Sequence, residues 1–307
     1  MQNIPHIPVL YREVIKAFEN IDSGVIIDCT MGYGGHSSMI LEKNPNIKLI
    51  AIDQDQTAIE FSTERLSKFG DRVSIRKGRF SNVIQEILKE VDASEIKGLL
   101  ADIGVSSLQL DQKERGFSYE SDNLDMRMDK GASLTAEVVV NEYSTNELEN
   151  IILEYGELRN YKKLASQIIK NRPFTSAKEL SDTLKPDLPR GKNIHPATLL
   201  MQAIRIEVND ELGELKSLLN SLANAGLSEA RIAIISFHSL EDRIVKQEFI
   251  KWSKSCICPR EAFRCECGNN HSLGKIVTRK PLMAKEDELK ENVRSRSAKM
   301  RVFQMEN

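Results

Sequence analysis

Residues 25–37 read VIIDCTMGYGGHS. The run Val25–Thr30 is apolar at successive positions, which is typical of a strand that is buried on both faces. Asp28 lies near the end of this run, and a glycine-rich turn follows it. Glycines let the backbone approach a ligand closely, and a helix that begins after such a turn presents free N–H groups. The stretch therefore predicts the first strand, turn and helix of a parallel α/β sheet. A ligand site is expected at the turn, and a tight turn without a ligand is the alternative.

Three further apolar runs resemble this strand: Lys48–Asp53, Arg72–Ile75 and Lys97–Asp102. Helical stretches lie between the runs, and strands that alternate with helices predict βαβ units and a parallel sheet. Later segments complete the expected sheet: Ala230–Phe237, Ile276–Met283 and Ala298–Met305.

A helical insertion is expected to interrupt this sheet, because helical signals follow one another after Asp102. Ser144 and Glu147 form a capping box that begins one of these helices. An apolar stripe from Ala197 to Leu222 predicts a single long helix. We therefore expect a sheet domain at residues 1–109 and 201–307 and a helical insertion domain at residues 110–200.

The composition and net charge limit the ways in which this chain could bind nucleic acid. The 307 residues are 40% hydrophobic and 29% charged, and their net charge of −2 gives no overall positive field. Contacts with nucleic acid would then need local basic patches. One such patch lies near the C-terminus: Lys275, Arg279, Lys280, Arg294, Arg296, Lys299 and Arg301. Residues 1–13 lack the apolar segment of a secretory signal, so we expect a cytosolic protein with reduced cysteines.

Polar residues mark the ends of the expected strands. Asp28 precedes the glycines and suits a cofactor with a cationic amino-acid tail, and the G-x-G-x-x-G pattern of nicotinamide enzymes is absent. Asp53 ends the second strand, where an acid accepts hydrogen bonds from ribose hydroxyls. Phe80 follows the third strand where an adenine ring would lie, although a core position is the alternative. Asp102 and Gln109 follow the fourth. Together these ends predict a site for an adenosine-type cofactor.

Several longer motifs resemble the ribosomal RNA small subunit methyltransferase H (MraW-type) family: TMGYGGHS, AIDQD, GRFS, DIGVSSLQLD, RGFS, LDMRMD, HPATLLMQAIRIEVNDEL, ISFHSLEDRIVK and RSRSAKMR. The resemblance covers almost the whole chain. It implies a Rossmann-like class I S-adenosylmethionine-dependent methyltransferase sheet and N4-methylation of a cytidine in 16S ribosomal RNA near the ribosomal P site. It also implies cofactor contacts at matching positions: Gly34, Gly35, His36, Asp53, Phe80, Asp102 and Gln109. The chain departs from the family's common pattern at Leu108 and Leu199, and the second departure puts a substrate role for that side chain in doubt.

Asp102 is the expected catalytic residue. The exocyclic amine of cytosine is a poor nucleophile, so it needs an acceptor for the positive charge that builds during attack. Asp102 lies at the right strand end, although a role in cofactor binding alone is the alternative. The Asp-Ile-Gly-Val sequence there lacks the prolines and the aromatic residue of other amino-methylating enzymes. Phe117 or His238 is therefore expected to orient the base, while Ser239 and Asp242 are expected to cap a helix.

The insertion is expected to select the RNA. Its entry and exit carry cations and an aromatic side chain that suit phosphates and bases: Arg115, Phe117, Arg127, Lys130, Lys185, Arg190 and Lys192. The alternative is that Phe117, Met126 and Met128 pack the insertion onto the sheet.

Four cysteines form a C-x-C-x6-C-x-C pattern: Cys256, Cys258, Cys265 and Cys267. Four thiolates suit a tetrahedral structural zinc ion, and a reduced cysteine-rich loop is the alternative. Three other functions stay open from the residues alone: a dinucleotide-dependent oxidoreductase, a methyltransferase of another RNA, and a non-catalytic zinc-bearing RNA-binding protein.

Overall fold

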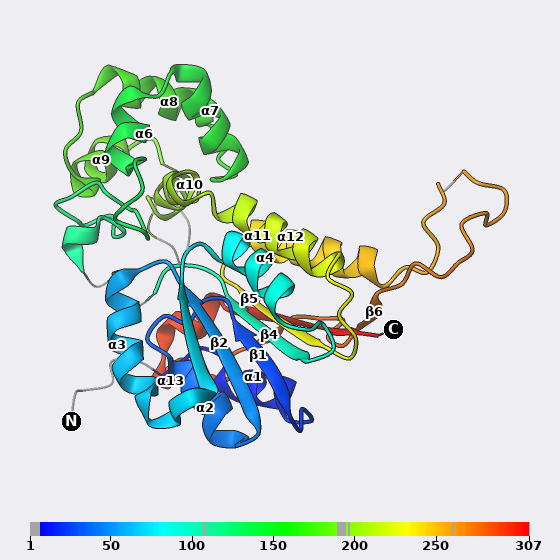
Figure 1. The fold of residues 1–307 in the computed structure, drawn as a ribbon. Coiled ribbons are helices and arrows are strands. Elements are labelled where there is room, and N and C mark those ends of the chain that lie inside the picture. The colour runs from blue at the N-terminus through cyan, green and yellow to red at the C-terminus, as the bar shows by residue number, and fades with distance from the viewer. Residues whose placement is uncertain are drawn as a thin grey trace. The chain divides into compact units, whose positions relative to one another are not determined.

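The computed structural model describes residues 7–106, 109–110, 112–188, 195, 197–259 and 261–306. The chain forms two compact units, residues 1–104 with 213–307 and residues 105–212 (Figure 1). The second unit is longer than the predicted insertion at residues 110–200. The difference at its end has a physical reason, since helix α10 (Thr198–Asn209) packs against helices α6 (Ala136–Glu142) and α7 (Thr145–Glu154).

The described part of the first unit is built on an eight-stranded sheet with the order β3-β2-β1-β4-β5-β8-β6, in which β7 also pairs with β8. The first five strands are parallel: β1 (Gly24–Asp28), β2 (Ile47–Asp53), β3 (Val73–Lys77), β4 (Ile96–Asp102) and β5 (Arg231–Ser236). The others are antiparallel: β6 (Gly274–Ile276), β7 (Leu282–Met283) and β8 (Lys299–Met305). The predicted Rossmann-like sheet is confirmed.

Helices cover both faces of this sheet. Alternate residues of β1 face opposite sides, so Ile27 joins one buried cluster and Ile26 joins another. The first cluster includes α4 (Phe80–Glu90), α11 (Glu211–Ala223) and α12 (Ser239–Trp252). The second includes α1 (Tyr11–Phe18), α2 (Gly35–Lys43) and α3 (Gln56–Leu66). Burial on both faces explains why the strands are apolar at successive positions. Three short elements complete the unit: η1 (Ser67–Arg72), α13 (Glu286–Glu291) and η3 (Val293–Ser297).

The second unit has a hydrophobic core of its own, which includes Leu148, Leu164 and Leu200. The elements around it include η2 (Lys113–Arg115), α6, α7, α8 (Tyr161–Lys170), α9 (Ala177–Leu184) and α10. Ser144 and Glu147 form the predicted capping box at the start of α7. None of the described helices is both long and apolar enough to cross a membrane.

Two predicted elements were wrong in their extent. The single helix expected from Ala197 to Leu222 is divided into α10 and α11, because Asp210 adopts a left-handed conformation with φ of 50°. The strand expected at Ile276–Met283 is divided into β6 and β7. Pro281 lies just before β7, and a proline has no N–H to donate to a sheet.

Candidate active site

The turn between β1 and α2 depends on its glycines. Gly32 and Gly34 have φ angles of 51° and 70°, a region in which other residues are strained. Gly34 is the N-cap of α2, and a Cβ atom on Gly35 would lie 2.5 Å from Cγ of Pro8. The helix therefore begins at the carboxyl end of β1 with its first N–H groups at the edge of the sheet. This is the turn that the sequence predicts.

Asp28 joins β1 to α2. One carboxylate oxygen accepts the Ser37 hydroxyl at 2.6 Å, and the other accepts the Thr30 N–H at 3.2 Å. Burial raises the pKa of this carboxyl to about 6. Groups of the chain itself thus bind both oxygens, which gives Asp28 a structural role. A contact with a cationic cofactor tail stays a prediction.

Asp53 ends β2 and connects this strand to the glycine turn. Its Oδ2 accepts the Gly32 N–H at 2.7 Å, and its Oδ1 accepts the Asp55 N–H at 2.8 Å. Burial raises the pKa of the Asp53 carboxyl to about 6. A carboxylate oxygen has two lone pairs, so each oxygen keeps one for a further donor. Asp55 caps α3 through the Thr57 N–H.

Asp102 ends β4 and differs from the other two acids. Its N–H donates to Oγ1 of Thr30 at 2.6 Å, which fixes the backbone at the strand end. Its side chain is 23% exposed, yet the Oδ1 atom is buried and has no hydrogen-bond partner among the described residues. Burial raises its pKa well above the ordinary value, and the nearby charges of Asp28 and Glu241 add to this effect. A buried acceptor without a donor is a place where a ligand gains by donating a hydrogen bond.

His36 lies next to this carboxylate. Its Nε2 donates to the Val9 carbonyl at 2.8 Å, and its Nδ1 lies 3.8 Å from Oδ2 of Asp102. Burial lowers the pKa of His36 to about 4, so the ring is neutral at physiological pH. The neutral imidazole therefore lies beside the Asp102 carboxylate and adds no positive charge there.

Phe80 is the first residue of α4, and Gly78 precedes it with a φ angle of 150°. The Phe80 ring is half-buried and packs against the core of the α4 face. The core position that was the alternative for Phe80 is thus occupied in part, and a contact with an adenine ring stays a prediction.

His238 follows β5, the strand next to β4, and is the N-cap residue of α12. The predicted cap by Ser239 is therefore wrong by one position. Glu241, which the sequence did not reveal, is fully buried and accepts the N–H groups of Phe237 and His238. The His238 ring is 7% exposed, with Nε2 3.1 Å from Oε1 of Glu241 and with Nδ1 unpartnered among the described residues. Two neighbouring strand ends thus each carry a buried polar atom for which the described part of the chain supplies no hydrogen-bond partner.

The arrangement expected of an adenosine-cofactor enzyme is present: a glycine turn, an acid at the end of β2, and an acid at the end of β4 whose Oδ1 has no partner among the described residues. Residues 3–306 match the model of the MraW methylase family. The chain belongs to this family. The predicted resemblance is confirmed, and membership favours a methyltransferase over the oxidoreductase alternative.

Close relatives of this MraW family member are similar over their whole length. The chain is 67% identical to the ribosomal RNA small subunit methyltransferase H of Sulfurimonas denitrificans, over 99% of both proteins. It is 60% identical to the protein of the same name from Aliarcobacter butzleri, over 99% of this chain and 100% of that protein. Among solved structures, a precorrin-6y C5,15-methyltransferase from Geobacter metallireducens matches 97% of this chain and 88% of its own, with 8% identity and a TM-score of 0.43.

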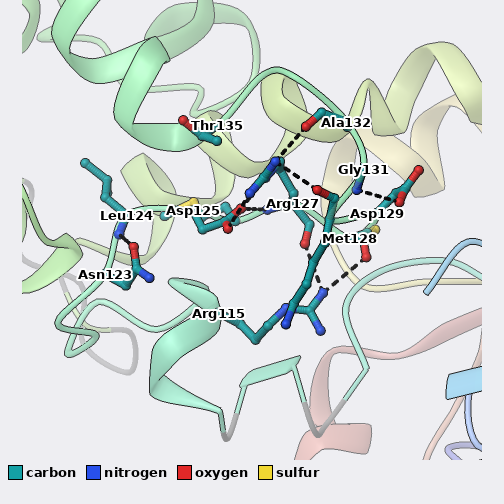
Figure 2. A network of polar contacts seen from close by, with 12 residues as sticks. Arg115, Asn123, Leu124, Asp125, Arg127, Met128, Asp129, Gly131, Ala132 and Thr135 are labelled. Carbon is teal, nitrogen blue, oxygen red and sulfur yellow. Dashed lines mark hydrogen bonds and ion pairs between the residues drawn. The ribbon is translucent and has the colours of Figure 1, made fainter. Parts of the chain in front are cut away.

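Arg115 of this MraW-type chain has a structural role in the second unit. It is 4% exposed and donates to the carbonyl oxygens of Arg127 and Met128 at 3.0 and 3.1 Å. Figure 2 shows the ion pair in the same loop, in which Arg127 binds the Asp125 carboxylate through two nitrogens. Arg127 also donates to the Ala132 carbonyl. The prediction that Arg115 contacts RNA phosphate is therefore replaced by a role in holding this loop.

Phe117, another residue of the second unit that is predicted to contact the substrate, is also buried. Phe117, Met126 and Met128 belong to the unit's own core, so the Phe117 ring is not displayed for base stacking. Gln109 is buried in the same unit, where its Oε1 accepts the Ser106 N–H at 3.0 Å. Lys130 and Lys185 are exposed, as a contact with phosphate requires. Leu108, Arg190 and Lys192 lie outside the described residues.

The four cysteines of the predicted metal site lie together in the first unit. Their sulfur atoms all lie within 4.8 Å of one another, although the two pairs are separated in the sequence. The Ile257 N–H donates to Sγ of Cys267, and this contact lowers the pKa of that thiol to about 5. Cys29, the remaining cysteine, is buried directly after the end of β1.

Proposed function

We propose that this chain transfers a methyl group from S-adenosylmethionine to N4 of a cytidine in 16S ribosomal RNA of the small ribosomal subunit, near the P site. The names of its relatives support the class of RNA, and the motifs of the family support the cytidine amine. Such a substrate requires the enzyme to act in the cytosol, where ribosomal subunits are found.

The observation that carries this proposal is that the buried Oδ1 atom of Asp102 has no hydrogen-bond partner within the part of the chain that the structure describes. The lone pair of the cytosine amine is conjugated with the ring, so the nitrogen gains nucleophilic character only if its N–H bonds are polarised. Asp102 Oδ1 accepts one of these N–H groups and stabilises the positive charge that develops on nitrogen. A fixed acceptor also orients the amine, which lowers the entropic cost of the reaction.

Other residues of the strand ends hold the cofactor. Asp53 accepts the ribose hydroxyls with the lone pairs that Gly32 and Asp55 leave free. Phe80 packs against the adenine ring, and the glycine turn with His36 lines the amino-acid end. When bound, S-adenosylmethionine supplies an electrophilic methyl group. His238 presents Nδ1 at the neighbouring strand end and there positions the cytosine.

The raised pKa of Asp102 suits the proton that the amine must lose, since a carboxylate with a raised pKa is a stronger base. The carboxylate is ionised above its pKa and protonated below it. The rate of methyl transfer should therefore rise with pH through the pKa of Asp102, and this rise should lie above the ordinary range of an aspartate.

The helical unit is proposed to select the RNA. Arg115 and Phe117 are buried, so the surface cations of the unit carry this role. Lys130 and Lys185 are exposed members of the predicted set. Phosphate contacts of this kind fix the position of an RNA without reading its sequence.

Asp102→Asn tests the proposal. The amide keeps the size of the side chain but lacks a basic oxygen, so methyl transfer to unmodified small subunits should fall about 100-fold or more. The affinity for S-adenosylmethionine, measured by calorimetry, should stay within about threefold. The acidic limb of the pH profile should also disappear. Wild-type rates in this variant would contradict the catalytic role, and loss of cofactor binding without a change in the pH profile would assign Asp102 to the cofactor alone.

A further inference from the structure

The segment between α12 and β6, residues 253–273, forms no regular element among its described residues. Figure 1 shows it as a long loop that extends from the end of α12. Its base is tied by backbone hydrogen bonds from His271 to Ser255 and from Leu273 to Trp252, at 2.9 and 2.8 Å. Its outer part has exposed apolar residues, with Phe263 fully exposed and Ile257 largely so. A loop of this length without a core needs another source of order.

The outer part is instead gathered around four sulfur atoms. The Sγ of Cys256 lies 3.5 Å from that of Cys265 and 3.7 Å from that of Cys267, and the Cys265 and Cys267 sulfurs are 3.6 Å apart. Four thiolates about 2.3 Å from one zinc ion lie at the corners of a tetrahedron whose edges are about 3.8 Å. These three separations are close to such edges and are far longer than a disulfide bond.

The backbone around the sulfurs is arranged reciprocally. The N–H of Ile257, between the first two cysteines, donates to Sγ of Cys267 at 3.4 Å. The N–H of Glu266, between the last two, donates to Sγ of Cys258 at 3.3 Å. Each C-x-C pair thus supplies an amide to a sulfur of the other pair. Hydrogen bonds to the ligand atoms orient them and stabilise their anionic form.

We propose that one Zn²⁺ ion is bound as a structural site by four thiolates: Cys256, Cys258, Cys265 and Cys267. Each ligand binds as the thiolate, so any cysteine that is protonated before binding releases its proton to solvent. Four sulfur ligands complete a tetrahedral shell and leave no open position for substrate or water. The ion therefore has no part in methyl transfer, and its role is to order residues 253–273.

The first test measures metal content. Protein purified without chelators should contain about one zinc ion per chain by elemental mass spectrometry, and Cys265→Ser with Cys267→Ser should contain none. Cys29→Ala removes a cysteine outside the cluster and should keep the ion. In native wild-type protein the four cluster thiols should resist a thiol reagent, and they should react once a strong chelator has removed the metal. Absence of zinc with four freely reactive thiols, a disulfide among these cysteines, or iron at one ion per chain would each overturn the zinc assignment.

The second test asks whether the metal orders residues 253–273 alone or is needed for the fold of the whole protein. If the double variant is insoluble, wild-type protein can be stripped of metal and loaded with Co²⁺, which should give the intense visible absorption of a tetrahedral thiolate site. Amide exchange in residues 253–273 should be at least tenfold faster without metal, while the strands keep their protection. Unchanged exchange in this loop would contradict the structural role. Neither measurement depends on methyl transfer, so this inference stands or falls independently of the proposed function.

Discussion

The three acids at the strand ends have the same side chain and different surroundings. Asp28 is bound by Ser37 and Thr30, Asp53 by two backbone amides, and Asp102 keeps one buried oxygen without a partner. Asp28 is therefore suited to hold the turn after β1. Asp53 is suited both to hold this turn and to bind the cofactor, and Asp102 is suited to accept a proton from the substrate. These differences follow from which donors the fold places beside each carboxylate.

Asp53→Ala tests the role of the second acid. The change removes the acceptor of the ribose hydroxyls, so the affinity for S-adenosylmethionine should fall by about 2–3 kcal/mol, or roughly 30- to 150-fold. Asp55→Ala is the matched control, because it removes the cap of α3 and should lower stability by about 1 kcal/mol without weakening the cofactor. Calorimetry should separate the two variants. Equal cofactor affinity in wild type and Asp53→Ala would refute the assignment.

At the level of single residues, the sequence predicts which acids lie at the strand ends but not their partners. Strand ends are set by apolar runs that can be recognised locally, so Asp28, Asp53 and Asp102 were found. The burial of Arg115 depends on carbonyl groups that a distant turn brings to it, and no local pattern reveals this. Glu241 was missed for a different reason, because its contacts are local: it accepts the N–H groups of Phe237 and His238 as the N3 residue of α12, and the predicted cap was placed one residue too late.

The helices and strands with a regular pattern of apolar residues were predicted well. The positions at which such an element is divided were not predicted. The parallel strands follow from runs that are apolar at successive positions, and α7 follows from its capping box. The division of α10 from α11 at Asp210 leaves the apolar stripe of the sequence uninterrupted, so periodicity could not detect it. A left-handed residue that is not glycine leaves little trace in a sequence.

The exposed lysines of the helical unit give a prediction at this scale. In the double variant Lys130→Ala with Lys185→Ala, affinity for small subunits should fall, and the salt dependence of binding should flatten by about 0.7 to 0.9 in the logarithmic slope for each lost phosphate contact. Cofactor affinity should be unchanged. Lys89→Ala, at an exposed position of α4, is the control.

An unchanged slope in the double variant would move RNA selection elsewhere. The basic segment near the C-terminus is then the next surface to test, but its cations are not equivalent. Arg301 is buried and forms an ion pair with Asp242, and Lys275 pairs with Glu306. Arg279, Lys280 and Arg296 are exposed and are the members to neutralise.

For the whole molecule, the two units have separate cores and separate proposed tasks. The sheet unit carries Asp53, Phe80 and Asp102, and the helical unit carries Gln109 and the exposed cations Lys130 and Lys185. A net charge of −2 gives the protein no general attraction to RNA. Recognition must then come from local contacts in a defined substrate, which fits a methyltransferase that modifies one site in a ribosomal subunit.

The central claim is that the methyl group is transferred to the exocyclic amine of cytidine in 16S ribosomal RNA. The direct measurement uses small subunits from a strain that lacks this enzyme, incubated with the purified protein and S-adenosylmethionine. The RNA is then digested and its nucleosides are identified by mass spectrometry against standards. N4-methylcytidine should then be found in 16S RNA, with none in reactions that contain Asp102→Asn. A methyl group on C5 of cytosine, on a ribose or on another RNA would contradict the claim.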